Sequence, residues 1–214
     1  MEIFFLRHGE TLWNREKRVQ GATPHVDLTE FGVKLAELTR EGFAAKGIRF
    51  DKAFTSPLRR ALHTAEIVMQ GQSCPLVVEP RLREMGFGPY EGTIIADGFF
   101  VDANIRACFR EPQRYAPPPG AESFAAVEAR LVDFMEGELR PLEDSYERVL
   151  VVSHGGMMRT VLRHLLKTPL SEYWNGRQPN CCVHIVKLEG GQFSLVRQTE
   201  VFYDPAIAAT VPSV

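Results

Sequence analysis

The sequence has few cysteines, no excess of either charge and no long apolar run. None of its four cysteines belongs to a C-x-x-C pair, which argues against a disulfide framework or a structural zinc site. Lys and Arg total 25 against 27 Asp and Glu, and the formal charge of −2 argues against a nucleic-acid-binding surface. No apolar run approaches the roughly 20 residues of a membrane span, and the N-terminus lacks the pattern of a secretion signal. We therefore expect a cytoplasmic protein that binds neither nucleic acid nor membrane.

The composition that is present is ordinary for a soluble globular domain. The chain has 214 residues, of which 44% are apolar and 24% charged, enough to build a core. Short apolar runs at 3–6 and 149–152 are typical of strands buried on both faces of a parallel sheet. Further strands are expected at 51–55 and 76–79, followed late in the chain by a hairpin of strands 182–188 and 193–198.

Helical patterns lie between these strands. Thr29 and Ser123 are expected to cap two helices, the first ending near residue 47 and the second carrying apolar residues to 139. Ser56 is expected to cap another helix, with Pro57 at its first position, and a fourth is expected over 155–166. This alternation predicts a three-layer α/β/α sandwich with a mostly parallel central sheet.

Basic side chains and histidines follow several of the predicted strands. Arg7 and His8 follow the first strand, Arg60 follows the second and His154 follows the run at 149–152. Ligands of open α/β sheets bind beyond the carboxyl ends of the strands, so we expect these side chains to meet at one rim. Clustered cations are favourable when an anion lies between them, and guanidinium groups match phosphate oxygens. Without a Walker loop or an acidic cluster, the predicted phosphate site is expected to need no metal and no cofactor.

Four segments contain the residues of this rim: L-R-H-G-E-T at 6–11, S-P-L-R-R-A at 56–61, L-R-E-M-G-F-G-P-Y-E-G at 82–92 and V-V-S-H-G-G at 151–156. In this order they resemble the blocks of the histidine phosphatase superfamily, also called the phosphoglycerate mutase-like superfamily. A short R-H-G alone is a weak signal, whereas four ordered blocks are specific. We expect one such domain over 1–204, with a partly irregular insertion over the active site at 81–122 and a C-terminal tail at 205–214.

The resemblance implies a role for each matching residue. His8 would attack phosphorus and become a phosphohistidine, while Arg7, Arg60 and His154 would hold the phosphoryl oxygens. Glu84 would donate a proton to the leaving oxygen and later activate water. The physical chemistry agrees, because a neutral imidazole is a nucleophile near pH 7 and neighbouring arginines disfavour its protonation.

Several other residues receive weaker assignments. The candidates for substrate binding are Asn14, Gln20, Gly21, Gly155 and Ser123. A helix N-cap would account for Ser123 by itself. In the second block the arginine directly before alanine is the matching one, so Arg59 is interpreted as a surface residue. His25 is interpreted as a surface loop residue. The residues interpreted as structural or packing groups are His63, His164, His184, Tyr173, Trp174, Cys181 and Cys182.

The blocks do not separate hydrolysis from phosphoryl transfer to a second substrate. Phosphoglycerate mutases of the family that depend on a cofactor carry longer insertions, whereas here residues 85–153, 69 in all, separate Glu84 from His154. This favours hydrolysis of a small phosphorylated metabolite with release of inorganic phosphate. The alternatives are such a mutase, an α-ribazole phosphatase-like hydrolase and, third, a non-catalytic phospho-ligand-binding module. The oligomeric state stays open, with a homodimer as one option.

Overall fold

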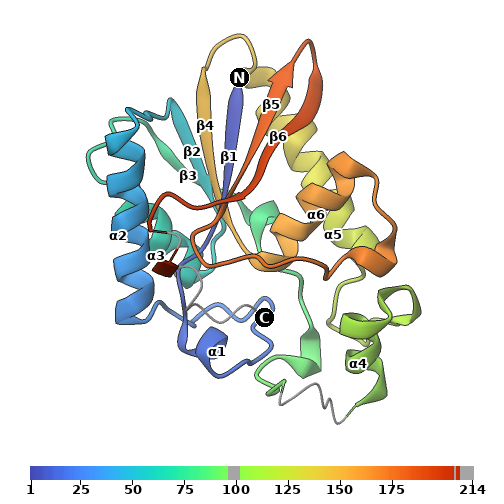
Figure 1. Ribbon diagram of the computed structural model, residues 1–214. Helices are drawn as coiled ribbons and strands as arrows, with labels where there is room; N and C mark the ends of the chain where they lie inside the picture. Colours follow the sequence, from blue (N-terminus) through green and yellow to red (C-terminus); the bar gives the residue numbers. More distant parts are fainter. Residues whose placement is uncertain (96–101, 205, 208–214) are drawn as a thin grey trace.

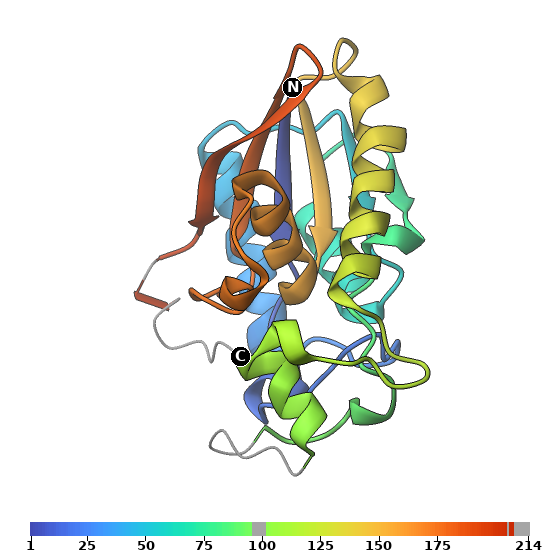
Figure 2. The same ribbon diagram turned by 90° about the vertical axis from the view of Figure 1, so that its right-hand side faces the viewer.

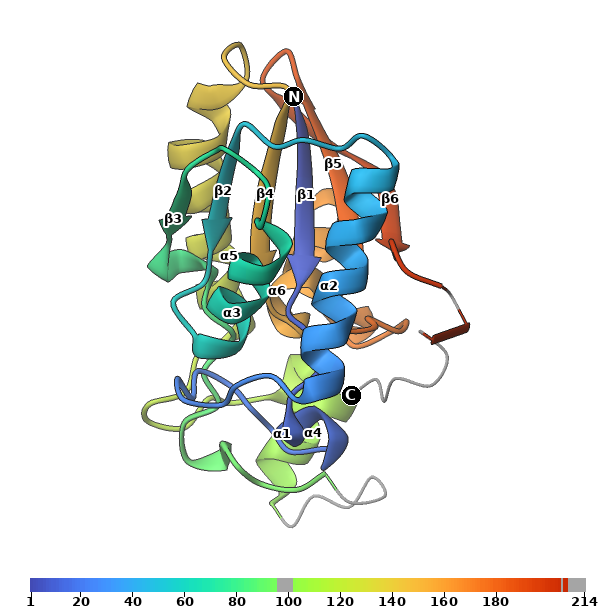
Figure 3. The same ribbon diagram turned by 90° about the vertical axis from the view of Figure 1, so that its left-hand side faces the viewer.

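A six-stranded sheet forms the centre of the molecule. The computed structural model describes residues 1–95, 102–204 and 206–207. The strands are β1 (Glu2–Arg7), β2 (Lys52–Thr55), β3 (Leu76–Val78), β4 (Arg148–Ser153), β5 (Val183–Glu189) and β6 (Gln192–Glu200). Their order in the sheet is β3-β2-β4-β1-β5-β6, which Figure 3 shows from left to right. The first four strands along the chain run parallel, and β5 pairs antiparallel with both β1 and β6.

Helices cover both faces of this sheet. On one face lie α2 (Glu30–Ala45) and α3 (Arg59–Val68), and on the other lie α5 (Phe124–Phe134) and α6 (Gly155–Leu166) (Figure 1). Two further helices, α1 (Leu12–Arg15) and α4 (Ala103–Arg110), lie beyond the carboxyl ends of the parallel strands (Figures 1 and 2). The predicted three-layer α/β/α sandwich with a mostly parallel sheet is confirmed.

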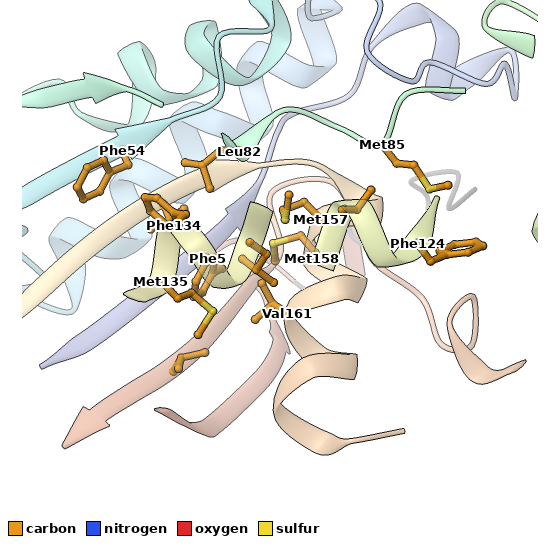
Figure 4. Close-up of a cluster of buried hydrophobic side chains, with 14 of the residues drawn as sticks. Phe5, Phe54, Leu82, Met85, Phe124, Phe134, Met135, Met157, Met158 and Val161 are labelled. Carbon is orange, nitrogen blue, oxygen red and sulfur yellow. The ribbon is translucent and has the colours of Figure 1, made fainter. Parts of the chain in front are cut away.

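The alternation of side chains along β1 divides the core into two clusters. Phe4 and Leu6 pack with residues of α2 and α3, whereas Ile3 and Phe5 pack with residues of α5 and α6. Figure 4 shows the second cluster, in which Phe5 lies among side chains of both helices. Successive residues of a strand point to opposite faces, so a strand covered on both sides is apolar throughout. Burying each of these side chains contributes about 1.5–3 kcal/mol.

Two of the three predicted serine and threonine caps are confirmed. The Thr29 hydroxyl accepts the Gly32 N–H at 3.0 Å, and the Ser123 hydroxyl accepts the Ala126 N–H at 3.1 Å. The prediction at Ser56 was wrong, because α3 begins at Arg59 with Leu58 as its N-cap. The Ser56 hydroxyl instead lies 2.7 Å from His154 Nε2, a contact with a residue 98 positions away that local sequence does not indicate.

The segment 81–122 contains short helices joined by irregular chain. It includes η2 (Gly88–Tyr90), α4 and η3 (Pro112–Arg114), and η1 (Pro80–Leu82) overlaps its start. Residues 96–101 lie outside the described part of the chain, as does the predicted tail at 205–214 apart from residues 206–207. None of the helices in the described residues is both long and apolar enough to cross a membrane.

We predict that Gly42→Ala destabilises the fold. Alanine normally stabilises a helix interior by about 1 kcal/mol relative to glycine. A Cβ on Gly42 of α2, however, would lie 1.8 Å from the Phe202 carbonyl oxygen, so either α2 or the chain after β6 must shift. Urea denaturation should show a loss of about 1–3 kcal/mol. The matched control is Gly137→Ala, whose Cβ would meet only the end of the Arg81 side chain at 3.5 Å. Equal effects of the two substitutions would contradict the prediction.

Candidate active site

His8 lies directly after β1, at the carboxyl end of the parallel strands, and is 2% exposed. Its Nδ1 lies 2.7 Å from the Gly9 carbonyl oxygen. A carbonyl only accepts hydrogen bonds, so Nδ1 carries the proton and the free lone pair belongs to Nε2. The pKa of His8 lies well below its ordinary value because burial disfavours the imidazolium, and because Arg60 and Arg7 repel its charge. His8 is therefore a neutral imidazole at neutral pH.

His154 follows β4 and occupies the N-cap position of α6. It is fully buried, and its ring centroid lies 5.2 Å from that of His8. Burial is the main reason that its pKa also lies well below the ordinary value, followed by the charge of Arg60. The structure therefore brings the two histidines of the predicted rim together, although they lie 146 positions apart in the chain.

Arg7 and Arg60 are buried and held by backbone carbonyls. Arg7 Nη1 donates to the Gln178 carbonyl, and the two Nη atoms of Arg60 donate to the carbonyls of Gly21 at 2.7 Å and Thr23 at 2.9 Å. Burial lowers the pKa of Arg60 to about 10, which still leaves the guanidinium charged at neutral pH. Within the described residues the Nε atom of each arginine is buried without a hydrogen-bond partner, so each keeps a donor for an anion.

Glu84 contributes the carboxylate of the site. Its Oε1 accepts the Met85 N–H and its Oε2 accepts the Gly156 N–H in the first turn of α6, both at 2.9 Å. An added Cβ on Gly156 would lie 2.5 Å from Oε1, so the glycine leaves the space in which the carboxylate lies. Backbone N–H groups of Met85 and of the first turn of α6 therefore fix the position of the Glu84 carboxyl group.

One pocket contains most of the predicted site residues. Its lining includes Arg7, His8, Asn14, Gln20, Gly21, Arg60, Glu84 and Gly155. His154 is not part of the lining and reaches the site through its contact with the His8 ring. Ser123 does not line the pocket either, and its hydroxyl is the cap of α5. Asn14 is 1% exposed and its Oδ1 accepts the Thr11 N–H at 3.1 Å, which fixes α1 beside the pocket.

Sequence reasoning missed Arg159 and Gln178 of the pocket lining. Arg159 lies one helical turn after Gly155 on α6, a spacing that could have indicated it. It donates to the carbonyls of Asn175 at 2.7 Å and Gly176 at 2.9 Å, and burial lowers its pKa to about 10. Gln178 comes from the irregular segment before β5, where no periodic pattern marks a residue.

The rest of the lining is largely apolar and aromatic, and it was also missed. It includes Val19, Phe87, Ile95, Phe109 and Trp174, together with Arg18. Trp174 packs as expected, with its ring centroid 4.6 Å from that of Phe109, and it also belongs to the pocket lining. Tyr173 is buried, as expected for packing.

The remaining histidines and Arg59 agree with the structural interpretations. His63 pairs with Asp27 and His164 pairs with Glu128, while His184 accepts the Thr199 N–H. Arg59 is 48% exposed in its side chain and also pairs with Asp27, outside the pocket.

We predict that the two neutral histidines make stability depend on pH. Below pH about 6.5 the unfolded chain protonates these residues while the folded chain does not, so the free energy of unfolding falls as the pH decreases. Replacing His8 with Asn removes one such group. Between pH 7.5 and 5.5 this variant should lose about 1.4 kcal/mol less stability than the parent chain, measured by urea denaturation. His25→Asn at an exposed position is the control, and an unchanged pH dependence in His8→Asn would contradict the prediction.

Comparison with known proteins finds a matching family model and several relatives. The family model described as histidine phosphatase superfamily (branch 1) matches residues 3–201. Among curated proteins, an adenosylcobalamin/α-ribazole phosphatase from Escherichia coli is 30% identical, over 85% of this chain and 87% of that protein. A 2,3-bisphosphoglycerate-dependent phosphoglycerate mutase from a Methylobacterium species is 34% identical, over 81% and 87%.

A solved structure is similar over almost the whole fold. The YhfR protein of Bacillus stearothermophilus is 30% identical, with a TM-score of 0.81 over 94% of this chain and 97% of that one. The chain belongs to branch 1 of the histidine phosphatase superfamily, whose members similar to it are phosphatases and phosphoglycerate mutases.

Proposed function

We propose that this protein is a metal-independent phosphomonoester hydrolase that acts through a phosphohistidine at His8. The observation that carries the proposal is the neutral His8 imidazole, which lines a pocket together with the buried guanidinium groups of Arg7 and Arg60. A neutral imidazole is a nucleophile, and the guanidinium groups provide charge for a phosphoryl group. A non-catalytic binding module would need the cations but not a nucleophilic lone pair beside an acid.

In the first step the lone pair on His8 Nε2 attacks phosphorus. The N–P bond forms as the bond from phosphorus to the ester oxygen breaks, and that oxygen takes a proton from the protonated Glu84 to leave as an alcohol. Arg7 and Arg60 stabilise the charge on the equatorial oxygens, and His154 lies beside the reacting ring.

In the second step water replaces the histidine. Its oxygen attacks phosphorus, its proton moves to the Glu84 carboxylate, and the electron pair of the N–P bond returns to His8 Nε2. Inorganic phosphate leaves, with His8 neutral and Glu84 protonated again for the next cycle. In this scheme the site needs no metal, because the guanidinium groups supply the charge and His8 supplies the nucleophile.

The apolar wall of the pocket favours hydrolysis over phosphoglycerate mutation. The length of the insertion does not distinguish a hydrolase from a mutase. This chain has the short insertion, yet it matches 87% of the length of the Methylobacterium mutase. A mutase must bind the carboxylate of a phosphoglycerate, whereas Phe87, Phe109 and Trp174 offer aromatic surface beside the phosphate position. An aromatic or apolar alcohol complements this wall.

Arg60→Ala should reduce kcat/KM far more than Arg59→Ala. Arg60 is fully buried at the site, so its loss should cost a factor of about 10²–10³ in phosphoester hydrolysis. Arg59 is an exposed neighbour in an ion pair with Asp27, so its loss should change the rate by less than about twofold. Steady-state assays of both variants, with thermal unfolding as a check on folding, compare the two. The reverse order would show that the wrong arginine was assigned.

The reaction itself is tested with p-nitrophenyl phosphate, α-naphthyl phosphate and 3-phosphoglycerate in the presence of EDTA. We expect phosphate release from the two aryl esters at a higher kcat/KM than from 3-phosphoglycerate. His8→Ala should lower turnover by at least about 10³-fold. Quenching with labelled substrate should trap label that is stable in base and lost in acid, and His8→Ala should trap none.

Two results would overturn the proposal in different ways. Loss of all activity in EDTA, with recovery on adding a metal, would contradict the metal-independent reaction. Interconversion of phosphoglycerates that depends on bisphosphoglycerate, and that exceeds phosphate release from every ester, would identify a mutase instead.

A further inference from the structure

Glu84 lies on a segment without regular secondary structure. Residues 83–87 connect η1 to η2, so their backbone groups need partners from elsewhere in the fold. Arg130 of α5 supplies them: its Nη1 donates to the carbonyls of Arg81 and Arg83, both at 2.6 Å, and its Nη2 donates to the carbonyl of Glu84 at 3.1 Å. One guanidinium group therefore donates hydrogen bonds to three backbone carbonyls, those of Arg81, Arg83 and Glu84.

Glu122 completes this arrangement from the other side. It forms a two-point pair with Arg130, with Nε to Oε1 at 3.0 Å and Nη2 to Oε2 at 3.1 Å. The same carboxylate accepts the Gly86 N–H at 2.8 Å and Arg83 Nη2 at 3.0 Å. Burial opposes ionisation of Glu122, but its hydrogen bonds with Arg130 and Gly86 outweigh this effect and lower its pKa. The pair is largely buried, with Arg130 only 10% exposed in its side chain.

The neighbours of Glu84 in the chain are also anchored. Leu82 and Met85 are fully buried and belong to the core cluster in Figure 4, and the Ser153 hydroxyl donates to the Leu82 carbonyl at 2.7 Å. The Glu84 carboxylate itself has little space, since a Cβ on Gly156 would lie 2.5 Å from it. A displacement of about 1 Å would therefore misplace the carboxylate, and errors of this size cost about 10²-fold in rate.

We propose that the Arg130–Glu122 pair is the positioning element for the acid of the reaction. Neither residue lines the pocket, so the pair does not contact the substrate position and acts on the acid through the backbone of Glu84. The planar fork of arginine is what allows one side chain to hold three carbonyls and a carboxylate together. This inference rests on the proposed role of Glu84 as the proton donor.

The competing explanation is that the pair only stabilises the fold. Loss of folded protein lowers the rate with every substrate by the same factor. A misplaced acid slows esters with poor leaving groups selectively, because activated esters need less protonation. The ratio of kcat/KM for p-nitrophenyl phosphate to kcat/KM for β-glycerol phosphate separates the two explanations.

Four variants of the full chain test this proposal. Glu84→Gln removes the acid and serves as the reference, and Arg130→Met and Glu122→Gln remove the two members of the pair. Glu128→Gln is the matched control, because Glu128 also lies on α5 and pairs with Arg163 of α6, away from Glu84. We expect the ratio to rise by at least about 10-fold in Arg130→Met and about 3-fold in Glu122→Gln, with less than a 2-fold change in Glu128→Gln.

The outcomes separate this inference from the proposed function. If the ratio rises in Glu84→Gln but Arg130→Met and Glu122→Gln match the control, the positioning role is overturned while the acid assignment stands. If the ratio does not rise in Glu84→Gln, the acid assignment itself is wrong and the inference fails with it. Should Arg130→Met fail to fold, the isosteric Glu122→Gln variant decides between the explanations.

Discussion

The burial of positive charge around one histidine is the constraint on which the site depends. Arg7 and Arg60 are removed from water and held by backbone carbonyls, which satisfy donors without neutralising charge. Their field, together with burial, keeps His8 unprotonated. The same charge that makes the pocket attractive to an anion therefore also disfavours protonation of His8, and both effects are lost if the guanidinium groups become exposed to solvent.

The parallel sheet explains how these groups meet. β1 and β4 are adjacent in the sheet, and Arg7 pairs in register with Ser153, so His8 and His154 extend from the same end of neighbouring strands. β2 lies on the other side of β4 and leads to α3 with Arg60. Three separate blocks of sequence thus reach one rim because parallel strands place their carboxyl ends together.

The remaining block, at 82–92, reaches the rim in a different way. Glu84 has no strand or long helix to place it, and side chains from α5 and from residue 122 replace the missing backbone ladder. The apolar wall also lies outside the sheet and its two helical layers, with Phe87 before η2 and Phe109 on the short helix α4. The sheet and its layers therefore place the histidines and Arg60, whereas the segments beyond them place Glu84 and the apolar wall.

The sequence by itself determined the fold class, the approximate positions of the strands and the candidate rim residues, because strand and helix periodicities and the four blocks are local patterns. Tertiary packing decided the contacts between residues that lie far apart in the sequence, which local patterns do not show. The Ser56 hydroxyl meets His154, Arg159 and Gln178 enter the pocket lining, and Arg130 binds the carbonyl of Glu84 from 46 positions away. Such contacts depend on how distant segments pack against a shared core, so they form only when the sheet and the helical layers are assembled.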